Sequence, residues 1–182
     1  MKHAFFVIVA MSLTACFLFA QSMNQPAELR QPHIIIKKNA RILEVFDGAK
    51  LVRSYKIALG FAPVGDKEIE GDGKTPEGEF YVFTKNPKSR FHLSLGLSYP
   101  SKPGAKRGLN AKLITDEEFE SINTAIETCG MPPQKTRLGG EIYIHGGGTD
   151  RDWTDGCIAL KNEEVTELFD LISKGARVLI VP

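Results

Sequence analysis

Lysine and arginine form no run and no basic face in this sequence, and the 23 basic side chains nearly equal the 22 acidic ones. A protein that binds nucleic acid through its phosphates needs a basic patch or stripe, so we exclude nucleic acid as a partner. The sequence also has no internal repeat and no low-complexity tract. What remains is the composition of an ordinary globular protein.

After residue 20, no apolar stretch approaches the roughly 20 residues that a membrane-spanning helix needs. Residues 1–20, MKHAFFVIVAMSLTACFLFA, have a positive charge at Lys2 and then an apolar run, which is typical of an export signal. We therefore predict a signal peptide over residues 1–20, a polar linker over 21–32 and one domain over 33–182 that works outside the cytoplasm. A permanent membrane anchor is the alternative.

The end of the predicted signal allows two interpretations. LTAC at residues 13–16 resembles the lipobox of bacterial lipoproteins, which would place a lipid on Cys16. The apolar run continues beyond this cysteine, however, and Ala20 followed by Gln21 suits ordinary signal cleavage. We prefer cleavage near Ala20.

Cysteine is scarce, and only Cys129 and Cys157 remain after the predicted signal. In an oxidising compartment the simplest expectation is one disulfide between them. A zinc site built on His145, Cys157 and the nearby aspartates is another alternative, but no second His or Cys lies at ligand spacing. We expect no metal and no cofactor.

Strand-type apolar runs dominate the chain. They occupy residues 33–38, 40–46, 50–59, 80–85, 91–100, 141–145 and 176–182. Asp47-Gly48-Ala49 predicts a hairpin between two of them, and residues 75–78 suit a β-turn because Pro and Gly take its second and fourth positions.

Two helices are predicted. Thr115 and Glu118 have capping-box spacing at the start of a helix that ends near Gly130. From Val165 the apolar residues recur at i, i+3, i+4 and i+7, which predicts a second helix that ends near Gly175. Many strands with only two helices predict a mainly β, α+β sandwich or barrel and not a doubly wound sheet.

The segment HGGGTDRDWTDGC, residues 145–157, joins a histidine to a cysteine. Alternation in EIYIH places His145 at the end of a strand on its polar face, beside three glycines. Gly156 before Cys157 lets a substrate carbonyl approach backbone N–H groups that would hold an oxyanion. A thiol beside an imidazole that takes its proton is a useful nucleophile. From spacing alone, a Cys/His dyad, a metal site and a loop beside a buried cysteine all stay open.

Three motifs, in order, resemble the catalytic domain of the YkuD-type L,D-transpeptidases. They are Lys74-Thr75-Pro76-x-Gly78-x-Phe80, His145-Gly146 and Thr154-x-Gly156-Cys157. The resemblance runs from about His33 to Pro182. It implies an L,D-transpeptidase-like β-sandwich or barrel of mixed sheets, in the periplasm or cell envelope of a bacterium, that acts on peptidoglycan stem peptides.

The resemblance also implies roles for single residues. Cys157 matches the nucleophile, His145 the general base and acid, Gly156 the glycine whose backbone holds the oxyanion, and Thr154 the supporting hydroxyl. A disulfide to Cys129 would silence this chemistry, so we predict two free thiols.

Two positions depart from the family pattern, and both bear on the substrate. Asp155 stands where most members have a second His, and Ala159 stands where they commonly have an Arg that helps to hold the substrate. Substrate recognition and the acyl acceptor therefore stay open.

One branch of the family offers a closer resemblance, through Trp153 and the segment SRFHLSLGLSYP at residues 89–100. This branch includes murein transpeptidases and hydrolases that detach lipoprotein from murein. On this basis Tyr99, Trp153, His92 and Arg90 are candidate substrate-binding residues.

The implied reaction is attack by Cys157 on a stem-peptide carbonyl, at the bond between the L-centre of the diamino acid and terminal D-alanine in a tetrapeptide donor. An amine from a second stem or a lipoprotein as acceptor gives a transpeptidase, for crosslinking or protein attachment. Water as acceptor gives an L,D-carboxypeptidase or amidase. Outside the enzyme class, a non-catalytic wall-binding envelope protein is the alternative.

Overall fold

The structure is a computed structural model that describes residues 29–182. The predicted signal peptide, its lipobox and most of the predicted linker lie outside the described residues. Within the described range, none of the helices combines the length and the apolar character needed to cross a bilayer.

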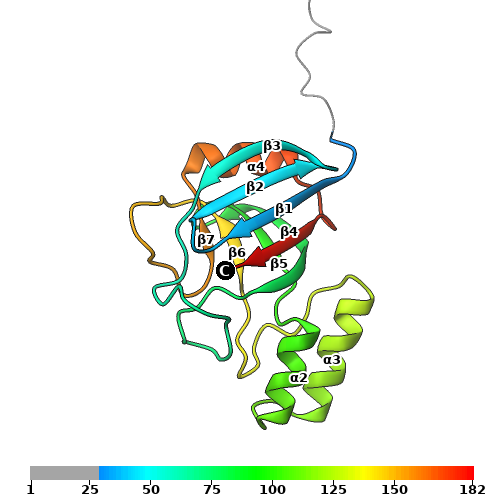
Figure 1. Cartoon of the computed structure of the whole chain (residues 1–182). Coiled ribbons are helices and arrows are strands. Elements are labelled where there is room, and N and C mark those ends of the chain that lie inside the picture. Colours follow the sequence, from blue (N-terminus) through cyan, green and yellow to red (C-terminus); the bar gives the residue numbers. More distant parts are fainter. Residues whose placement is uncertain (1–28) are drawn as a thin grey trace, which may run out of the picture.

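Strands make up most of the described chain. Their bounds are β1 (Pro32–Lys37), β2 (Ile42–Asp47), β3 (Lys50–Lys56), β4 (Gly78–Ser89), β5 (His92–Leu97), β6 (Tyr143–His145), β7 (Ile158–Ala159) and β8 (Arg177–Val181). They form one curled sheet in the order β3-β2-β1-β8-β4-β5-β6-β7 (Figure 1). The β1–β8 and β6–β7 pairs are parallel and the other pairs antiparallel, so the predicted mainly β fold with mixed pairing is confirmed.

The main core lies on the concave side of this sheet. Alternation sends Ile34 and Ile36 of β1 and Val178 and Ile180 of β8 to the same side, where each is at most 1% exposed. Helix α4 (Asn162–Leu171) adds Val165 and Leu168 to the same core. Burying each such side chain contributes roughly 1.5–3 kcal/mol. Strands β6, which ends at His145, and β7, which begins directly after Cys157, lie at one end of the strand order (Figure 1).

Of the two turns predicted from the sequence, the structure contains one. The hairpin between β2 and β3 is confirmed, and Gly48 has a φ of 58°, which favours glycine. The β-turn predicted at residues 75–78 is wrong, because this segment runs extended into β4. The buried hydroxyl of Thr75 accepts the N–H of Gly60 at 3.1 Å, and its carbonyl accepts Lys38 Nζ at 2.8 Å. The motif therefore fixes a loop and does not reverse the chain.

Helix α3 (Asp116–Glu127) begins as predicted. The Thr115 hydroxyl accepts the N–H of Glu118 at 3.2 Å, and the Glu118 carboxylate accepts the N–H of Thr115 at 2.8 Å. These reciprocal bonds satisfy two N–H groups that the helix itself leaves unpaired.

A third helix, α2 (Lys102–Asn110), was not predicted, so the expected number of two is wrong for the described residues. Ser101 caps it, and Gly108 allows its backbone to pack on Leu138, since a Cβ there would lie 2.7 Å from Cδ2 of that side chain. Helices α2 and α3 form a lobe beside the sheet (Figure 1). The lobe has a small core of its own, made of Ala105, Ile114, Ile122 and Leu138.

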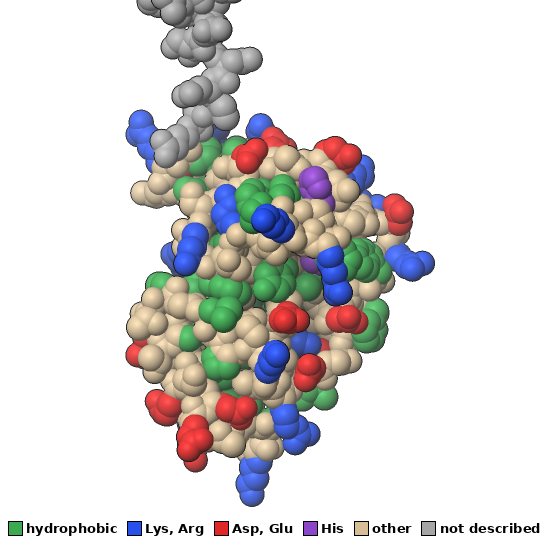
Figure 2. Space-filling model, turned by 180° about the vertical axis from the view of Figure 1, so that it is seen from behind, with side chains coloured by type: hydrophobic (Ala, Val, Ile, Leu, Met, Phe, Trp, Pro, Cys, Tyr) green, Lys and Arg blue, Asp and Glu red, His purple; other side chains and the backbone are tan. Residues whose placement is uncertain are grey.

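Charge on the surface is mixed, as the composition predicts. In the view from behind, acidic and basic side chains are interspersed, and hydrophobic side chains gather across the middle of the face (Figure 2). This face has no extended region of one sign.

Candidate active site

Parallel pairing of β6 with β7 places His145 at the end of one strand and Cys157 directly before the other, and among the described residues the thiol and the imidazole each bond to backbone groups and not to each other. Ile144 pairs with Ile158 and His145 with Ala159. Alternation then places the histidine and the cysteine on one face, opposite the two buried isoleucines. A strand spacing of about 4.8 Å and a rise of about 6.6 Å over two residues put their Cα atoms about 8 Å apart, within reach of side chains.

The thiol of Cys157 is held by the backbone of the segment that enters β6. Sγ donates to the carbonyl of Glu141 at 3.3 Å and accepts the N–H of Tyr143 at 3.4 Å. Burial raises the pKa of Cys157 to about 11, although the N–H of Tyr143 opposes the shift, and the nearby charges of Asp155 and Glu141 raise it further. The resting thiol is therefore protonated at neutral pH.

This raised pKa predicts how Cys157 reacts with iodoacetamide. Alkylation should be slow at pH 7 and should rise about tenfold per pH unit toward pH 10, because only the thiolate reacts. A resting thiolate–imidazolium pair would instead give a rate that is already level above about pH 6. Mass spectrometry of the Cys129→Ser variant measures the alkylation rate of Cys157. The Cys157→Ala variant gives the rate of the exposed thiol of Cys129 for comparison.

His145 is 3% exposed, and its ring is fixed by its neighbour in the chain. Nδ1 lies 2.6 Å from the carbonyl oxygen of Gly146. A carbonyl only accepts, so Nδ1 carries the hydrogen and Nε2 of the neutral ring keeps a lone pair. Burial lowers the pKa of His145, against the hydrogen bond to Gly146 and with a smaller contribution from Arg90. The ring is therefore neutral at pH 7 and able to take a proton.

Aromatic rings surround this imidazole. Phe91 stacks on it with ring centroids 4.6 Å apart, and Trp153 meets it edge-on at 5.6 Å. Phe91 lies in the turn between β4 and β5, and its carbonyl accepts the N–H of Gly146 at 3.0 Å. Sequence reasoning did not single out Phe91, for which the only signal was an aromatic residue inside SRFHLSLGLSYP.

Thr154 and Gly156 shape the turn before Cys157. The Thr154 hydroxyl donates to the carbonyl of Cys157 at 2.7 Å and accepts the N–H of Gly156 at 3.2 Å. Gly156 has a φ of 126°, and a Cβ there would lie 2.7 Å from the Lys74 carbonyl. The N–H of Gly156 is thus engaged by Thr154 within the turn, and the oxyanion contact from the backbone of Gly156 and Cys157 stays a prediction.

The loop from residue 60 to residue 77 packs tightly against the turn before Cys157. A Cβ on Gly60 would lie 2.0 Å from the carbonyl oxygen of Gly73 and 3.1 Å from Cα of Gly156. The N–H of Phe61 donates to the carbonyl of Thr154 at 2.9 Å. The position of the cysteine turn therefore depends on the shape of this loop.

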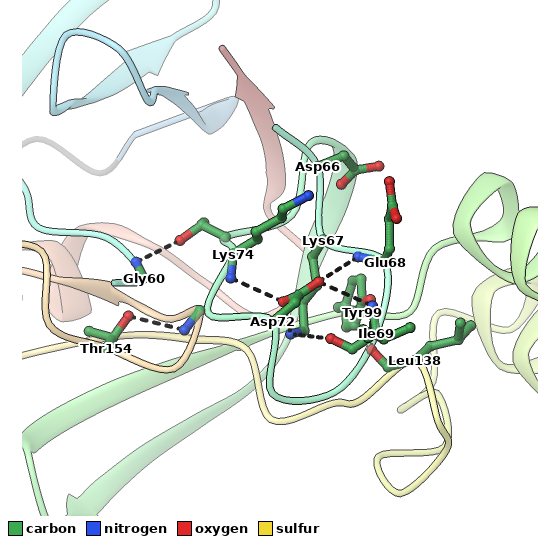
Figure 3. A network of polar contacts seen from close by, with 12 residues as sticks. Gly60, Asp66, Lys67, Glu68, Ile69, Asp72, Lys74, Tyr99, Leu138 and Thr154 are labelled. Carbon is green, nitrogen blue, oxygen red and sulfur yellow. Dashed lines mark hydrogen bonds and ion pairs between the residues drawn. The ribbon is translucent and has the colours of Figure 1, made fainter. Parts of the chain in front are cut away.

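A buried ion pair holds the same loop (Figure 3). Lys67 is 3% exposed, and its Nζ donates to Asp72 at 2.8 Å and to the carbonyl of Ile69 at 3.0 Å. The Asp72 carboxylate also accepts the backbone N–H groups of Glu68, Ile69 and Lys74 (Figure 3). Sequence reasoning did not foresee this network, because charged residues in a Gly-rich loop are usually solvated.

The structure divides the four predicted substrate-binding residues. Arg90, whose guanidinium lies 4.9 Å over the ring of Phe91, and Trp153 lie near His145. His92 is exposed and its ring contacts Thr166 of α4 at 2.9 Å.

Tyr99 does not line an open groove, and this prediction is corrected. Its side chain is 3% exposed, its hydroxyl donates to the carbonyl of Leu138 at 2.9 Å, and burial raises its pKa. Tyr99 therefore joins the main core to the lobe of α2 and α3.

Both cysteines of the described chain are free thiols. Cys129 is exposed at the end of α3 and lines a hollow of about 1320 Å³ between the lobe and the outer face of β1, β8 and β4. Neither His145 nor Cys157 lines that hollow. Within residues 29–182, no group of three or more His, Cys, Asp or Glu side chains is arranged to hold a metal ion.

Two curated relatives match this chain over most of its length. The protein named "Putative L,D-transpeptidase YafK" of Escherichia coli strain K12 is 26% identical over 196 residues, which cover 97% of this chain and 66% of the relative. "Putative L,D-transpeptidase YqjB" of Bacillus subtilis strain 168 is 33% identical over 158 residues, which cover 82% of this chain and 70% of the relative.

Solved structures share the fold. The helical cell shape determining protein Pgp2 of Campylobacter jejuni superposes with a TM-score of 0.55 at 22% identity, over 91% of this chain and 54% of that one. Bd1075 of Bdellovibrio bacteriovorus gives 0.54 at 20% identity, over 86% and 50%. The chain thus spans 66% of the Escherichia coli relative and about half of each solved structure.

The family model of YkuD, the L,D-transpeptidase catalytic domain, matches residues 31–180. Within the described chain this match includes β1 to β7, all but the last residue of β8 and the three helices, together with the three motifs and the cysteine turn. The chain therefore belongs to the L,D-transpeptidase catalytic domain family.

Proposed function

We propose that this protein is an L,D-transpeptidase that transfers acyl groups of peptidoglycan stem peptides through a thioester on Cys157. The observation that carries the proposal is the hydrogen bond from His145 Nδ1 to the carbonyl of Gly146. It leaves Nε2 as the free acceptor of a neutral imidazole on the face that also carries the thiol.

In the first half-reaction, Nε2 of His145 takes the proton of Cys157 as sulfur attacks the stem-peptide carbonyl. The N–H of Cys157 donates to the developing oxyanion. The C–N bond breaks, the imidazolium returns the proton to the leaving amine, and a thioester remains. Because the resting thiol is protonated, proton transfer accompanies the attack.

In the second half-reaction, the acceptor attacks the thioester carbonyl while His145 takes its proton. The C–S bond breaks and the proton passes to the sulfur of Cys157. An amine acceptor from a second stem or a lipoprotein gives transpeptidation. Water in its place gives an L,D-carboxypeptidase or amidase. The chemistry needs no metal or cofactor, and it requires export to the cell envelope, which stays a prediction.

The proposal is tested by incubating the purified protein with sacculi and analysing the muropeptides by mass. We expect D-alanine to be lost from tetrapeptide stems, together with new crosslinks or altered lipoprotein attachment. Cys157→Ala should abolish these products, and Cys129→Ala is the matched control that should keep them. Product masses identify the acceptor as an amine or as water.

Identical muropeptides from wild type and Cys157→Ala, on sacculi with and without bound lipoprotein, would contradict catalysis. Stable binding to sacculi that survives Cys157→Ala without any product would instead favour a non-catalytic wall-binding protein.

A further inference from the structure

One side of the ion pair of Lys67 with Asp72 packs on the backbone segment that holds the thiol of Cys157. Gly139 of this segment has a φ of 84°, and a Cβ there would lie 3.4 Å from Cε of Lys67. Two residues later, the carbonyl of Glu141 accepts a hydrogen bond from the thiol at 3.3 Å. The Lys67 side chain therefore packs beside the segment that fixes the sulfur from one side.

The other side of the ion pair is connected to the turn that carries Cys157. The Asp72 carboxylate accepts the N–H of Lys74 at 3.0 Å (Figure 3). The carbonyl oxygen of Lys74 lies 2.7 Å from the place that a Cβ on Gly156 would take, so the loop and the turn are in direct backbone contact. The ion pair is thus linked to both segments that hold the sulfur, and its ammonium is almost wholly removed from solvent.

The charges that act on the sulfur of Cys157 oppose one another. Burial is the largest cause that raises the pKa of this thiol, and Asp155 and Glu141 raise it further. The ammonium of Lys67 lowers the same pKa. The imidazole of His145 is neutral at rest, because burial lowers its pKa. Lys67 is therefore the cation that acts on the sulfur before the proton moves.

Stability alone gives no reason for a buried ammonium at this place, because apolar side chains of similar volume often stabilise a fold as well as a buried ion pair does. A fixed charge in a site that excludes water, however, stabilises charge that develops during a reaction. We propose that Lys67 is a positioning residue of the reaction, whose fixed ammonium stabilises the negative charge that develops on the sulfur of Cys157. The proposal rests on the proposed function, since it assigns a role in that same reaction.

Negative charge develops on the sulfur twice in this reaction. It first appears as the thiol proton passes to Nε2 of His145 and the sulfur attacks the carbonyl. It appears again when the C–S bond of the thioester breaks and its electron pair returns to the sulfur. Lys67 keeps its own protons in both steps, because its Nζ donates to Asp72 at 2.8 Å and to the carbonyl of Ile69 at 3.0 Å. It acts through its charge and not as an acid.

The test measures the alkylation of Cys157 by iodoacetamide at pH 8.5, in the Cys129→Ser background. Lys67→Met should slow this reaction about threefold to fivefold, because loss of the cation raises the pKa of the thiol and lowers the thiolate fraction. A merely structural role predicts the opposite sign, since a loosened loop exposes the thiol and lets its pKa fall toward the ordinary value, about 8.5. Lys102→Met, which removes an exposed ion pair, is the matched control and should leave the rate unchanged.

The double variant Lys67→Met, Asp72→Asn separates charge from stability, because it leaves no buried charge unpaired. Its alkylation rate should stay about threefold below that of wild type. A double variant that reacts at the wild-type rate would overturn the proposal. A Lys67→Met variant that reacts faster than wild type would do so as well.

Release of D-alanine from stem peptides gives a second measurement. Lys67→Met should lower kcat about threefold to fivefold and leave KM unchanged, because the buried ammonium acts on the sulfur and not on the substrate. Slower alkylation of Lys67→Met, with no product from wild type, would refute the proposed function and keep the role of Lys67. Turnover by wild type, with unchanged alkylation of Lys67→Met, would refute the role of Lys67 and keep the proposed function.

Discussion

Replacing His145 with alanine is expected to lower turnover on stem peptides at pH 7 by roughly 100- to 10,000-fold, the range for loss of a positioned general base. The reason lies in the state of the thiol. Burial raises the pKa of Cys157 to about 11, so at pH 7 almost no thiolate exists unless a base takes the proton during attack. Initial rates of D-alanine release with wild type and variant measure the loss.

The pH dependence of this loss separates a missing base from a damaged fold. As pH rises toward 10, the thiolate forms without help, so the deficit of His145→Ala should shrink. Because burial lowers the pKa of His145, wild-type activity should fall only below the ordinary value for histidine, about 6.5. His33→Gln, on β1 and away from the site, is the matched control. A His145→Ala variant with more than about a tenth of wild-type activity at pH 7 would contradict a general base at this position.

Asp72→Asn is expected to lower the free energy of unfolding by about 3 kcal/mol, the lower end for breaking one side of a buried pair. Lys67 is 3% exposed, and the substitution leaves its ammonium without a counter-charge. For a chain of this size the change corresponds to a fall in Tm of roughly 6 to 12 °C. Thermal unfolding followed by circular dichroism measures it.

Two comparisons sharpen this test. Glu127→Gln removes an exposed partner of Lys102 and should change stability by less than about 1 kcal/mol. The double variant Lys67→Met, Asp72→Asn should recover part of the loss, because no buried charge then remains unpaired. If Asp72→Asn has the same Tm as wild type, the ion pair of Lys67 with Asp72 does not stabilise this loop.

The ion pair of Lys67 with Asp72 also predicts how the free energy of unfolding depends on pH. Burial alone would raise the pKa of Asp72, but the hydrogen bonds from Lys67 and from the backbone N–H groups around it outweigh burial and hold this pKa below its ordinary value. A carboxyl with a lowered pKa stabilises the fold above its unfolded value, about 3.9, and this contribution is lost as pH falls through the folded value. The difference in the free energy of unfolding between wild type and Asp72→Asn should therefore become smaller below about pH 4.

The sequence predicts most of the sheet and misses one helix, for physical reasons. Strands can be predicted from the alternation of apolar and polar residues, and α3 can be predicted from the capping box at Thr115. Helix α2 contains Pro103, Gly104 and Gly108, residues that weaken a helix by propensity. Its contact with Leu138, in a distant part of the chain, forms only in the folded protein.

The candidate site shows the same limit. Cys157 and His145 were identified because their motifs are local in the sequence. Phe91 reaches the imidazole only through the pairing of β5 with β6, which no short pattern encodes. Tyr99 was misassigned because alternation tells which side chains share a face but not which face meets solvent.

Among the described residues, the parallel pairing of β1 with β8 places the first and last strands side by side in the middle of the sheet. In the order of the sheet, β8 lies between β1 and β4 and so joins the β1–β3 hairpins to the β4–β5 hairpin. A chain interrupted before Arg177 would present two unpaired sheet edges, and such edges promote aggregation. Closure of so long a loop is also slow. Truncation before β8 should therefore yield insoluble chains and not a smaller stable domain.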